Sequence, residues 1–195
     1  MHAAVATAPR RPAGTALMPD AVLAMFVFVA CEVMFFAALI SAQFVVRGNT
    51  GHWPPVDQPR LPVLTTLGNT LVLLASGFML RAAASAWRGR KRDLAASRLR
   101  WAVWLGTLFV GVQGMEWTRL IHYGLTLQSS SYGSFFYLII GAHALHAVIA
   151  LSLLFHACLA MVSGVLRESR WQAAQIFWYF VVGLWPFLYV LVYLL

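Results

Sequence analysis

Five long stretches of apolar residues, separated by shorter polar segments, dominate the pattern of this chain. A helix rises about 1.5 Å per residue and the hydrocarbon core of a bilayer is about 30 Å thick, so each stretch is long enough to cross a membrane. The pattern predicts an all-α, polytopic membrane protein whose single domain, residues 21–195, is a bundle of five transmembrane helices. The predicted helices cover residues 21–46, 61–86, 101–123, 133–163 and 171–195.

The composition supports this fold class and excludes an ordinary soluble domain. The chain has 195 residues, of which 61% are hydrophobic and 10% charged, and its mean hydropathy is +0.75. Arg10 and Arg11 precede the first apolar stretch, but that stretch is too long for the hydrophobic region of a signal peptide. We interpret residues 1–20 as a flexible cytoplasmic tail before a retained first helix.

The basic residues fall mainly on one side of the predicted bundle. Of the 14 Lys and Arg, all but Arg47, Arg60 and Arg119 lie in the tail, around the segment between the second and third helices, or between the fourth and fifth helices. Cytoplasmic loops are enriched in Lys and Arg, which predicts a cytoplasmic N-terminus and an external C-terminus. Membrane topology therefore explains the net charge of +8 better than nucleic-acid binding does.

The second helix carries small and polar residues that predict close contacts between helices. We interpret the basic segment RGRKRDLAASRLR, residues 88–100, as a cytoplasmic linker, and Pro186 as a kink in the last helix. The predicted packing residues of the second helix are Asn69, Thr70, Ser76 and Gly77.

Ionisable residues inside the apolar stretches are the candidate functional residues, because a charge at the bilayer centre costs a few kcal/mol unless it has a partner or a role. Glu32 lies about 21 Å below the outer end of its helix, and His143 and His146 lie about 14 and 18 Å down the fourth helix. The two histidines are spaced i, i+3 and share one helix face. We therefore predict that Glu32 contacts His143 or His146 across the interface between the first and fourth helices. The other intramembrane candidates are Glu116 and His156.

Three functional interpretations of these residues compete. Two Glu and two His are plausible ligands for a di-iron or zinc site, but Glu116 lies only about 9 Å below the outer boundary and no Glu-x-x-His motif is present. A proton-coupled transporter with Glu32 as the carrier is disfavoured by five helices without an inverted repeat. The third interpretation is that these polar groups tie helices together. We assign no catalytic, metal-binding or cofactor-binding residue.

Six motifs occur in order along the chain and support a family assignment. They are ACEVMFF, WPP, LGNTLVLLASG, LGTLFVGVQGMEW, YGSFFYLIIGAHALHAVIA and FWYFVVGLWPFLYVLVYLL. Together they resemble subunit III of haem-copper cytochrome c oxidases over nearly everything after residue 20. The chain is similar to the five-helix bacterial form, which lacks the first two helices of the larger seven-helix members.

The resemblance implies a non-redox subunit of a respiratory terminal oxidase that reduces oxygen to water in the bacterial inner membrane. Such a subunit packs against subunit I, belongs to a complex with subunit II and other respiratory subunits, and binds structural phospholipid. It supports proton uptake and the durability of the active site, while haem and copper reside in the partner subunits. By motif, Glu32 matches the family's intramembrane glutamate, Glu116 its second acidic residue, and His143 and His146 its histidines in the fourth helix. These four are our candidates for intramembrane polar residues with a proton or lipid-associated role.

The last helix departs from the family pattern. Family members usually read Trp-His-Phe-Val-Asp, whereas this chain has Tyr179 and Val182 in place of the His and the Asp. The contacts that the family makes through that pair do not carry over. A cytochrome c oxidase, a quinol oxidase and a nitric oxide reductase accessory subunit therefore all stay open, and Glu32 within CEVMFF favours the cytochrome c oxidase.

Overall fold

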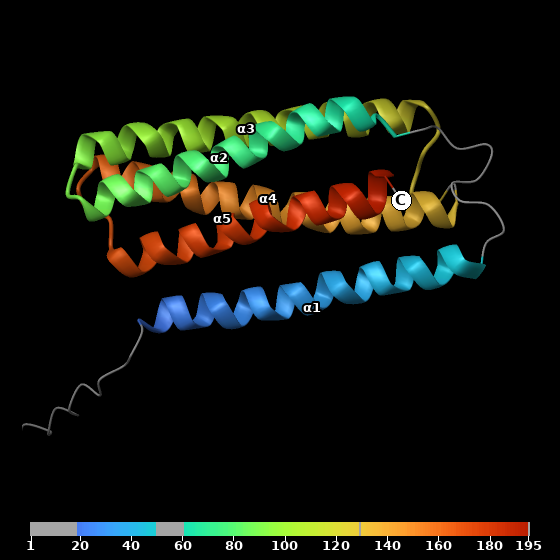
Figure 1. Ribbon diagram of the computed structural model, residues 1–195, viewed down its shortest axis with the longest axis horizontal. Helices are drawn as coiled ribbons and strands as arrows, with labels where there is room; N and C mark the ends of the chain where they lie inside the picture. Colours follow the sequence, from blue (N-terminus) through green and yellow to red (C-terminus); the bar gives the residue numbers. More distant parts are fainter. Residues whose placement is uncertain (1–18, 50–60, 129, 195) are drawn as a thin grey trace, which may run out of the picture.

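The computed structural model describes residues 19–49, 61–128 and 130–194, and within these ranges the chain forms helices and no strand. Figure 1 shows an up-and-down bundle in which successive helices run in opposite directions. The predicted all-α fold is confirmed. Most of the tail that we assigned to residues 1–20 lies outside the described residues.

Five α-helices and one terminal π-helix make up the described chain. Four of its helical segments, including the fifth helix with its π-helical continuation, are long and apolar enough to cross a membrane, which fits a multi-pass membrane protein. The helices are α1 (Asp20–Asn49), α2 (Val63–Arg88), α3 (Arg92–His122), α4 (Ser131–Val162) and α5 (Glu168–Leu188), followed by the π-helix η1 (Tyr189–Leu194).

The third helix begins at Arg92, not at residue 101, so the interpretation of residues 88–100 as a linker was wrong. The connection between α2 and α3 is a tight turn, in which Arg90 has a positive φ of 58°. Ala95 and Leu99 are fully buried and extend the apolar side of α3 toward its start. Arg92 and Arg100 are exposed, and Arg98 donates a hydrogen bond to the Ala82 carbonyl of α2 at 3.0 Å. These arginines conceal the apolar pattern in the sequence and dilute the apolar composition of α3.

The closest pair of helices is α2 and α3, which run side by side along one edge of the bundle (Figure 1). The buried residues of α3 recur at alternating spacings of four and three, which is the heptad pattern of a coiled-coil seam. Small residues on both helices allow this close approach. The buried residues of α3 are Ala95, Leu99, Ala102, Gly106, Phe109, Gln113, Glu116 and Leu120.

The helices form three layers. The pair α4 and α5 lies in the middle, the pair α2 and α3 covers one side, and α1 packs alone on the other side against α4 and α5 (Figure 1). In α1 only Val22, Phe36 and Gln43 are buried. This helix therefore presents most of its apolar side chains to its surroundings, which in a membrane means lipid or another protein chain.

Pro186 lies inside α5, three residues before the chain changes from α-helix to π-helix at Tyr189. Proline has no N–H to donate to the carbonyl four residues earlier, so the regular hydrogen-bond ladder is interrupted at this point. The changed helical geometry turns Tyr193 into the bundle, where it is buried.

The α2–α3 and α4–α5 connections lie at the same end of the bundle (Figure 1). Basic residues concentrate in that half of the bundle. Nine of the eleven Lys and Arg in the described residues lie in the half of the bundle next to these connections, and the other two are Arg47 and Arg119. The helical serpentine thus separates the charges as the sequence pattern predicts.

Candidate functional site

The predicted contact between Glu32 and the fourth helix is present. The carboxylate of Glu32 on α1 lies 2.9 Å from Nε2 of His146 on α4, and both side chains are largely shielded. The matched depths that the sequence indicated follow from the antiparallel course of α1 and α4. This contact is a polar link between the outermost helix and the middle layer.

The second ring nitrogen of His146 defines how many protons the pair holds. Nδ1 lies 2.6 Å from the carbonyl oxygen of Ala142, and because a carbonyl only accepts, Nδ1 must carry hydrogen. Nε2 and the Glu32 carboxyl then share one proton, either as imidazolium with carboxylate or as neutral imidazole with neutral acid. Both arrangements leave the pair with zero net charge, which lowers its cost inside a membrane.

Aromatic rings surround the imidazole of His146. The ring of Phe36 lies 5.5 Å from it in an edge-on orientation, and Phe177 and Phe180 lie at 6.2 and 6.4 Å. These apolar neighbours lower the local dielectric, which strengthens the interaction between Glu32 and His146. The surrounding phenylalanines come from α1 and α5, so three helices meet at the pair.

His143 does not share the Glu32 site, although it lies one turn earlier on the same helix. Its ring lies 5.0 Å from the ring of Trp185 on α5, and the side chain is only 1% exposed. Residues spaced i, i+3 differ by about 60° around a helix axis. Because α4 lies between α1 and α3, this angle turns one histidine toward α1 and the other toward the interior of the bundle.

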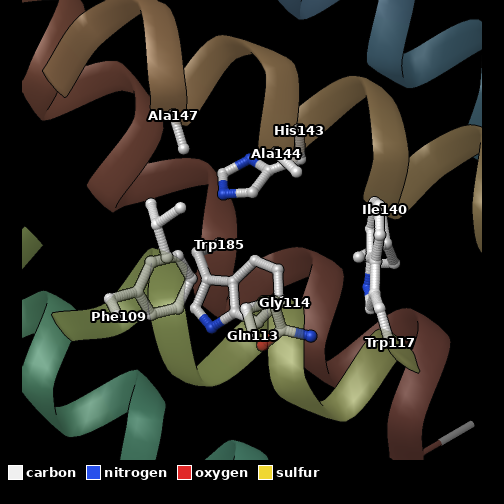
Figure 2. Close-up of a pocket in the computed structure, with 10 residues that line it drawn as sticks. Phe109, Gln113, Gly114, Trp117, Ile140, His143, Ala144, Ala147 and Trp185 are labelled. Carbon is white, nitrogen blue, oxygen red and sulfur yellow. The ribbon is translucent and has the colours of Figure 1, made fainter. Parts of the chain in front are cut away.

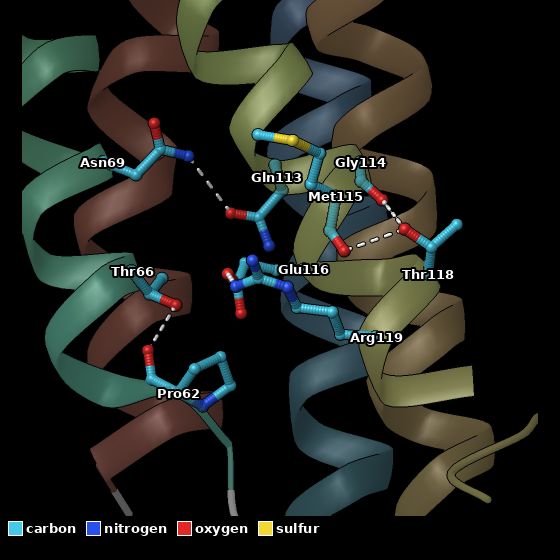
Figure 3. Close-up of polar contacts among 9 residues, drawn as sticks. All are labelled: Pro62, Thr66, Asn69, Gln113, Gly114, Met115, Glu116, Thr118 and Arg119. Atoms are coloured by element: carbon cyan, nitrogen blue, oxygen red, sulfur yellow. Dashed lines mark hydrogen bonds and ion pairs between the residues drawn. The ribbon is translucent and has the colours of Figure 1, made fainter. Parts of the chain in front are cut away.

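Glu116 occupies a second, separate polar site. It is buried on α3, and its carboxylate accepts a hydrogen bond of 2.9 Å from Arg119, one turn later (Figure 3). Arg119 is 67% exposed, so its long side chain reaches outward while its charge neutralises the buried carboxylate. Glu32 and Glu116 therefore each have their own partner.

Near Glu116, a chain of amide and hydroxyl groups joins three elements. Asn69 on α2 donates to the Phe109 carbonyl at 3.1 Å and lies 3.5 Å from the side-chain oxygen of Gln113 on α3 (Figure 3). Gln113 in turn donates to the hydroxyl of Tyr193 in η1 at 3.1 Å. Our sequence reasoning missed Gln113 and Tyr193, although a glutamine within an apolar helix is a signal for a buried hydrogen bond.

Two tryptophans of α5 hold it to α2. Trp178 donates to Ser76 at 3.1 Å, and Ser76 donates to the Ala102 carbonyl of α3 at 2.8 Å. Trp185 donates to Thr70 at 2.8 Å. The sequence reasoning selected the two hydroxyl residues but missed their donors, whose spacing of seven residues along α5 was the available signal.

The two positions that depart from the family pattern have different surroundings. Val182 is buried against Gly77 of α2, where a Cβ at the glycine would lie 2.9 Å from a Val182 methyl group. Tyr179 is 38% exposed and lines a groove with Arg81 and Arg88. Valine thus makes an apolar helix contact where an aspartate would bury a carboxylate.

Chemically, these groups form separate hydrogen-bonded links between helices. Within the described ranges, no group of three or more His, Cys, Asp or Glu is arranged to hold a metal ion. His156 bonds to the Ser152 carbonyl of its own helix at 2.7 Å and lies on the exposed side of α4. The proton and lipid roles suggested for Glu32, Glu116, His143 and His146 stay predictions.

Comparison with known proteins gives a consistent result. The family model described as cytochrome c oxidase subunit III matches residues 14–195. The chain is 32% identical over 174 residues to the probable cytochrome c oxidase subunit 3 of Nocardia farcinica, covering 86% of this chain and 84% of that protein. It is 34% identical over 175 residues to the Mycobacterium leprae protein of the same name, with the same coverage. With cytochrome c oxidase subunit 3 of Branchiostoma floridae it shares 35% identity over 180 residues, covering 87% of this chain and 67% of the relative.

Proposed function

The chain belongs to the cytochrome c oxidase subunit III family and is a non-catalytic subunit of a multisubunit oxidase complex, and we propose that within it the chain packs through α1 against the catalytic subunit I. The observation that carries this proposal is the α1 helix itself. Most of its apolar side chains are exposed, while its one intramembrane acidic residue, Glu32, is paired internally with His146. Such a face fits another apolar helix surface better than water.

In this proposal the subunit carries no haem or copper, and the redox centres reside in subunits I and II. The Glu32–His146 pair holds one proton without net charge, and its role is to fix α1 to the middle layer. A fixed α1 presents a stable surface to subunit I, which keeps the active site and its proton uptake intact during repeated turnover. The relatives compared above are all oxidase subunits, and no feature of the described site favours a quinol oxidase, a nitric oxide reductase, a metalloenzyme or a transporter.

We propose that the membrane is a bacterial plasma membrane, with the N-terminus in the cytoplasm and the C-terminus outside. The support is the concentration of Lys and Arg around the α2–α3 and α4–α5 connections. Two of the relatives compared above, the Nocardia farcinica and Mycobacterium leprae proteins, are bacterial, which supports the bacterial membrane.

Structural phospholipid binds, in this proposal, in a groove between α2 and α5 at the basic end of the bundle. Arg81 and Arg88 line it together with Gln175 and Tyr179, and apolar side chains such as Phe78 continue it toward the membrane centre. Neither arginine has a carboxylate partner among the described residues. Two cations above an apolar wall suit an anionic phospholipid, with its phosphate at the arginines and an acyl chain along the wall.

The subunit assignment is tested by isolating the oxidase from native membranes through a tag on this chain. We expect haem-containing subunit I and subunit II to co-purify, with a visible haem spectrum. Complexes stripped of this chain should keep their initial rate of oxygen reduction and lose it faster during turnover. Recovery of the chain without any haem-containing partner, or loss of the initial rate on stripping, would contradict the proposal.

The lipid site is tested by native mass spectrometry of the purified complex with added phosphatidylglycerol. A basic residue near an anionic surface contributes about 1 kcal/mol, so Arg81→Gln and Arg88→Gln should each weaken binding about fivefold. Lys91→Gln, in the exposed turn outside the groove, is the matched control and should bind as the unmodified protein does. Equal binding by all three variants would exclude this groove as the site.

A further inference from the structure

A cavity of about 190 Å³ lies among α3, α4 and α5 and is partly open at the exposed residue Gly114 (Figure 2). His143 projects into it from α4, Trp185 from α5, and Phe109, Gln113 and Trp117 from α3. Gly114 and Ala144 contribute little side-chain volume to its wall. The cavity is separate from the Glu32–His146 pair, which lies on the α1 side of α4.

His143 is the unusual residue of this cavity. Its side chain is 1% exposed, and neither of its ring nitrogens has a hydrogen-bond partner in the part of the chain that the structure describes. A neutral imidazole has one N–H and one lone pair, and an imidazolium has two N–H groups. In each protonation state, therefore, two buried polar atoms of this ring need partners.

Trp117 adds a second unpartnered group to the same cavity. Its Nε1–H is buried and finds no acceptor among the described residues. The side chain of Gln113 bonds elsewhere, because its oxygen faces Asn69 and its nitrogen donates to Tyr193, and it makes no hydrogen bond to His143 or Trp117 Nε1. The wall thus combines aromatic carbon with at least two N–H donors that no protein group satisfies.

The chemistry of these groups selects the occupant. Leaving a buried donor or acceptor without a partner is costly, and native proteins almost always provide a protein group or an ordered water. An apolar guest such as an acyl chain would satisfy none of the three nitrogens. A water molecule takes roughly 30 Å³ and bonds as both donor and acceptor, so the cavity has room for several.

We propose that this cavity is a buried hydration site, in which ordered water accepts a hydrogen bond from Trp117 Nε1 and bonds to both ring nitrogens of His143. The water provides polar partners at a depth where lipid has none. Bridging water also joins α3 to α4 at a place where their side chains do not bond directly. This inference does not depend on the proposed contact with subunit I or on the lipid groove.

The direct test is a structure of the intact oxidase complex at a resolution that shows ordered water. We expect density within hydrogen-bond distance of His143 and of Trp117 Nε1. An acyl chain in the cavity, or a direct bond from a partner subunit to His143, would overturn the proposal. So would a cavity without density around these nitrogens.

A second test compares the thermal stability of the purified complex with His143→Phe and with His143→Gln. In a hydrated cavity, phenylalanine removes the bonds to water and should lower the melting temperature, while glutamine keeps a donor and an acceptor and should lower it less. In a dry cavity the order reverses, because phenylalanine removes unpaired polar atoms. His156→Phe on the exposed side of the same helix is the control for added apolar area. If the His143 variants do not assemble, the density in the unmodified complex decides.

Discussion

Glu32 of α1 and His146 of α4 form a polar pair with 2.9 Å between carboxyl oxygen and Nε2, and the bond of the second imidazole nitrogen to the Ala142 carbonyl means that the pair shares a single proton. Because the pair is neutral as a unit, it anchors a helix without placing a net charge in the membrane. It is a polar contact between α1 and α4 within the apolar part of the bundle, so substitutions there should report on how α1 is held.

Glu32→Gln should preserve assembly and the haem spectrum of the complex. The amide has nearly the same size and donates a hydrogen bond to Nε2 of His146, which is then neutral. Glu32→Leu leaves that nitrogen without a partner, and we expect it to destabilise the subunit by about 1–3 kcal/mol. Thermal unfolding of the purified complex measures the difference, and Asp20→Asn at the exposed start of α1 is the control.

Oxygen reduction distinguishes an anchoring role from metal binding at the same residues. Substituting Glu32, Glu116, His143 or His146 one at a time should leave the initial turnover and the metal content largely unchanged, with faster decay of the rate during catalysis. Loss of one ligand from a metal site would reduce metal content and turnover together. Parallel loss of both in any of these variants would overturn the non-catalytic assignment of the four residues.

Arg119→Leu should destabilise the subunit more than Glu116→Gln does. The leucine leaves a buried carboxylate without its cation, whereas the glutamine removes the charge that needs one. Because Arg119 is 67% exposed, we expect a loss of about 1–2 kcal/mol and not the full effect of a buried pair. Adding Glu116→Gln to Arg119→Leu should recover most of this loss, and a double variant no more stable than Arg119→Leu alone would contradict the argument.

Ser76→Ala should loosen the contact among α2, α3 and α5. The substitution removes the acceptor of the Trp178 indole N–H and the donor to the Ala102 carbonyl, all within a fully buried region. We expect a loss of about 1–3 kcal/mol in the stability of the subunit. Ser85→Ala on the exposed side of the same helix should change stability by less than about 0.5 kcal/mol, and equal effects at both positions would exclude a special role for Ser76.

Gly106→Ala and Gly111→Ala offer a matched comparison on α3. A Cβ at Gly106 would lie 2.7 Å from the Trp178 ring, whereas a Cβ at Gly111 would meet no atom within 4 Å. Overpacking at the first position should cost about 1–3 kcal/mol. Alanine at the second should be neutral or stabilising by up to about 1 kcal/mol, because it favours the helix. Thermal unfolding of both variants checks this order, and an equally tolerated Gly106→Ala would show that Trp178 moves freely.

The heptad pattern in α3 shows where sequence reasoning failed and why. Ala95 and Leu99 continue the buried seam, but they lie among arginines, and the charges suggested a solvated linker. Hydropathy averages over all sides of a helix, so it cannot separate a basic outer side from an apolar inner one. Spacing of the small and apolar residues was the better signal.

By itself, the sequence determined the helical class, the serpentine course, the uneven distribution of charge and the depth match between Glu32 and the fourth helix. These properties follow from apolar length and from the rise of a helix, which are local quantities. Only the tertiary structure decided that His146, and not His143, meets Glu32, and that His143 faces a cavity with Trp117. The physical reason is that helix rotation depends on the packing of all five helices, and about 60° of rotation separates the two histidines.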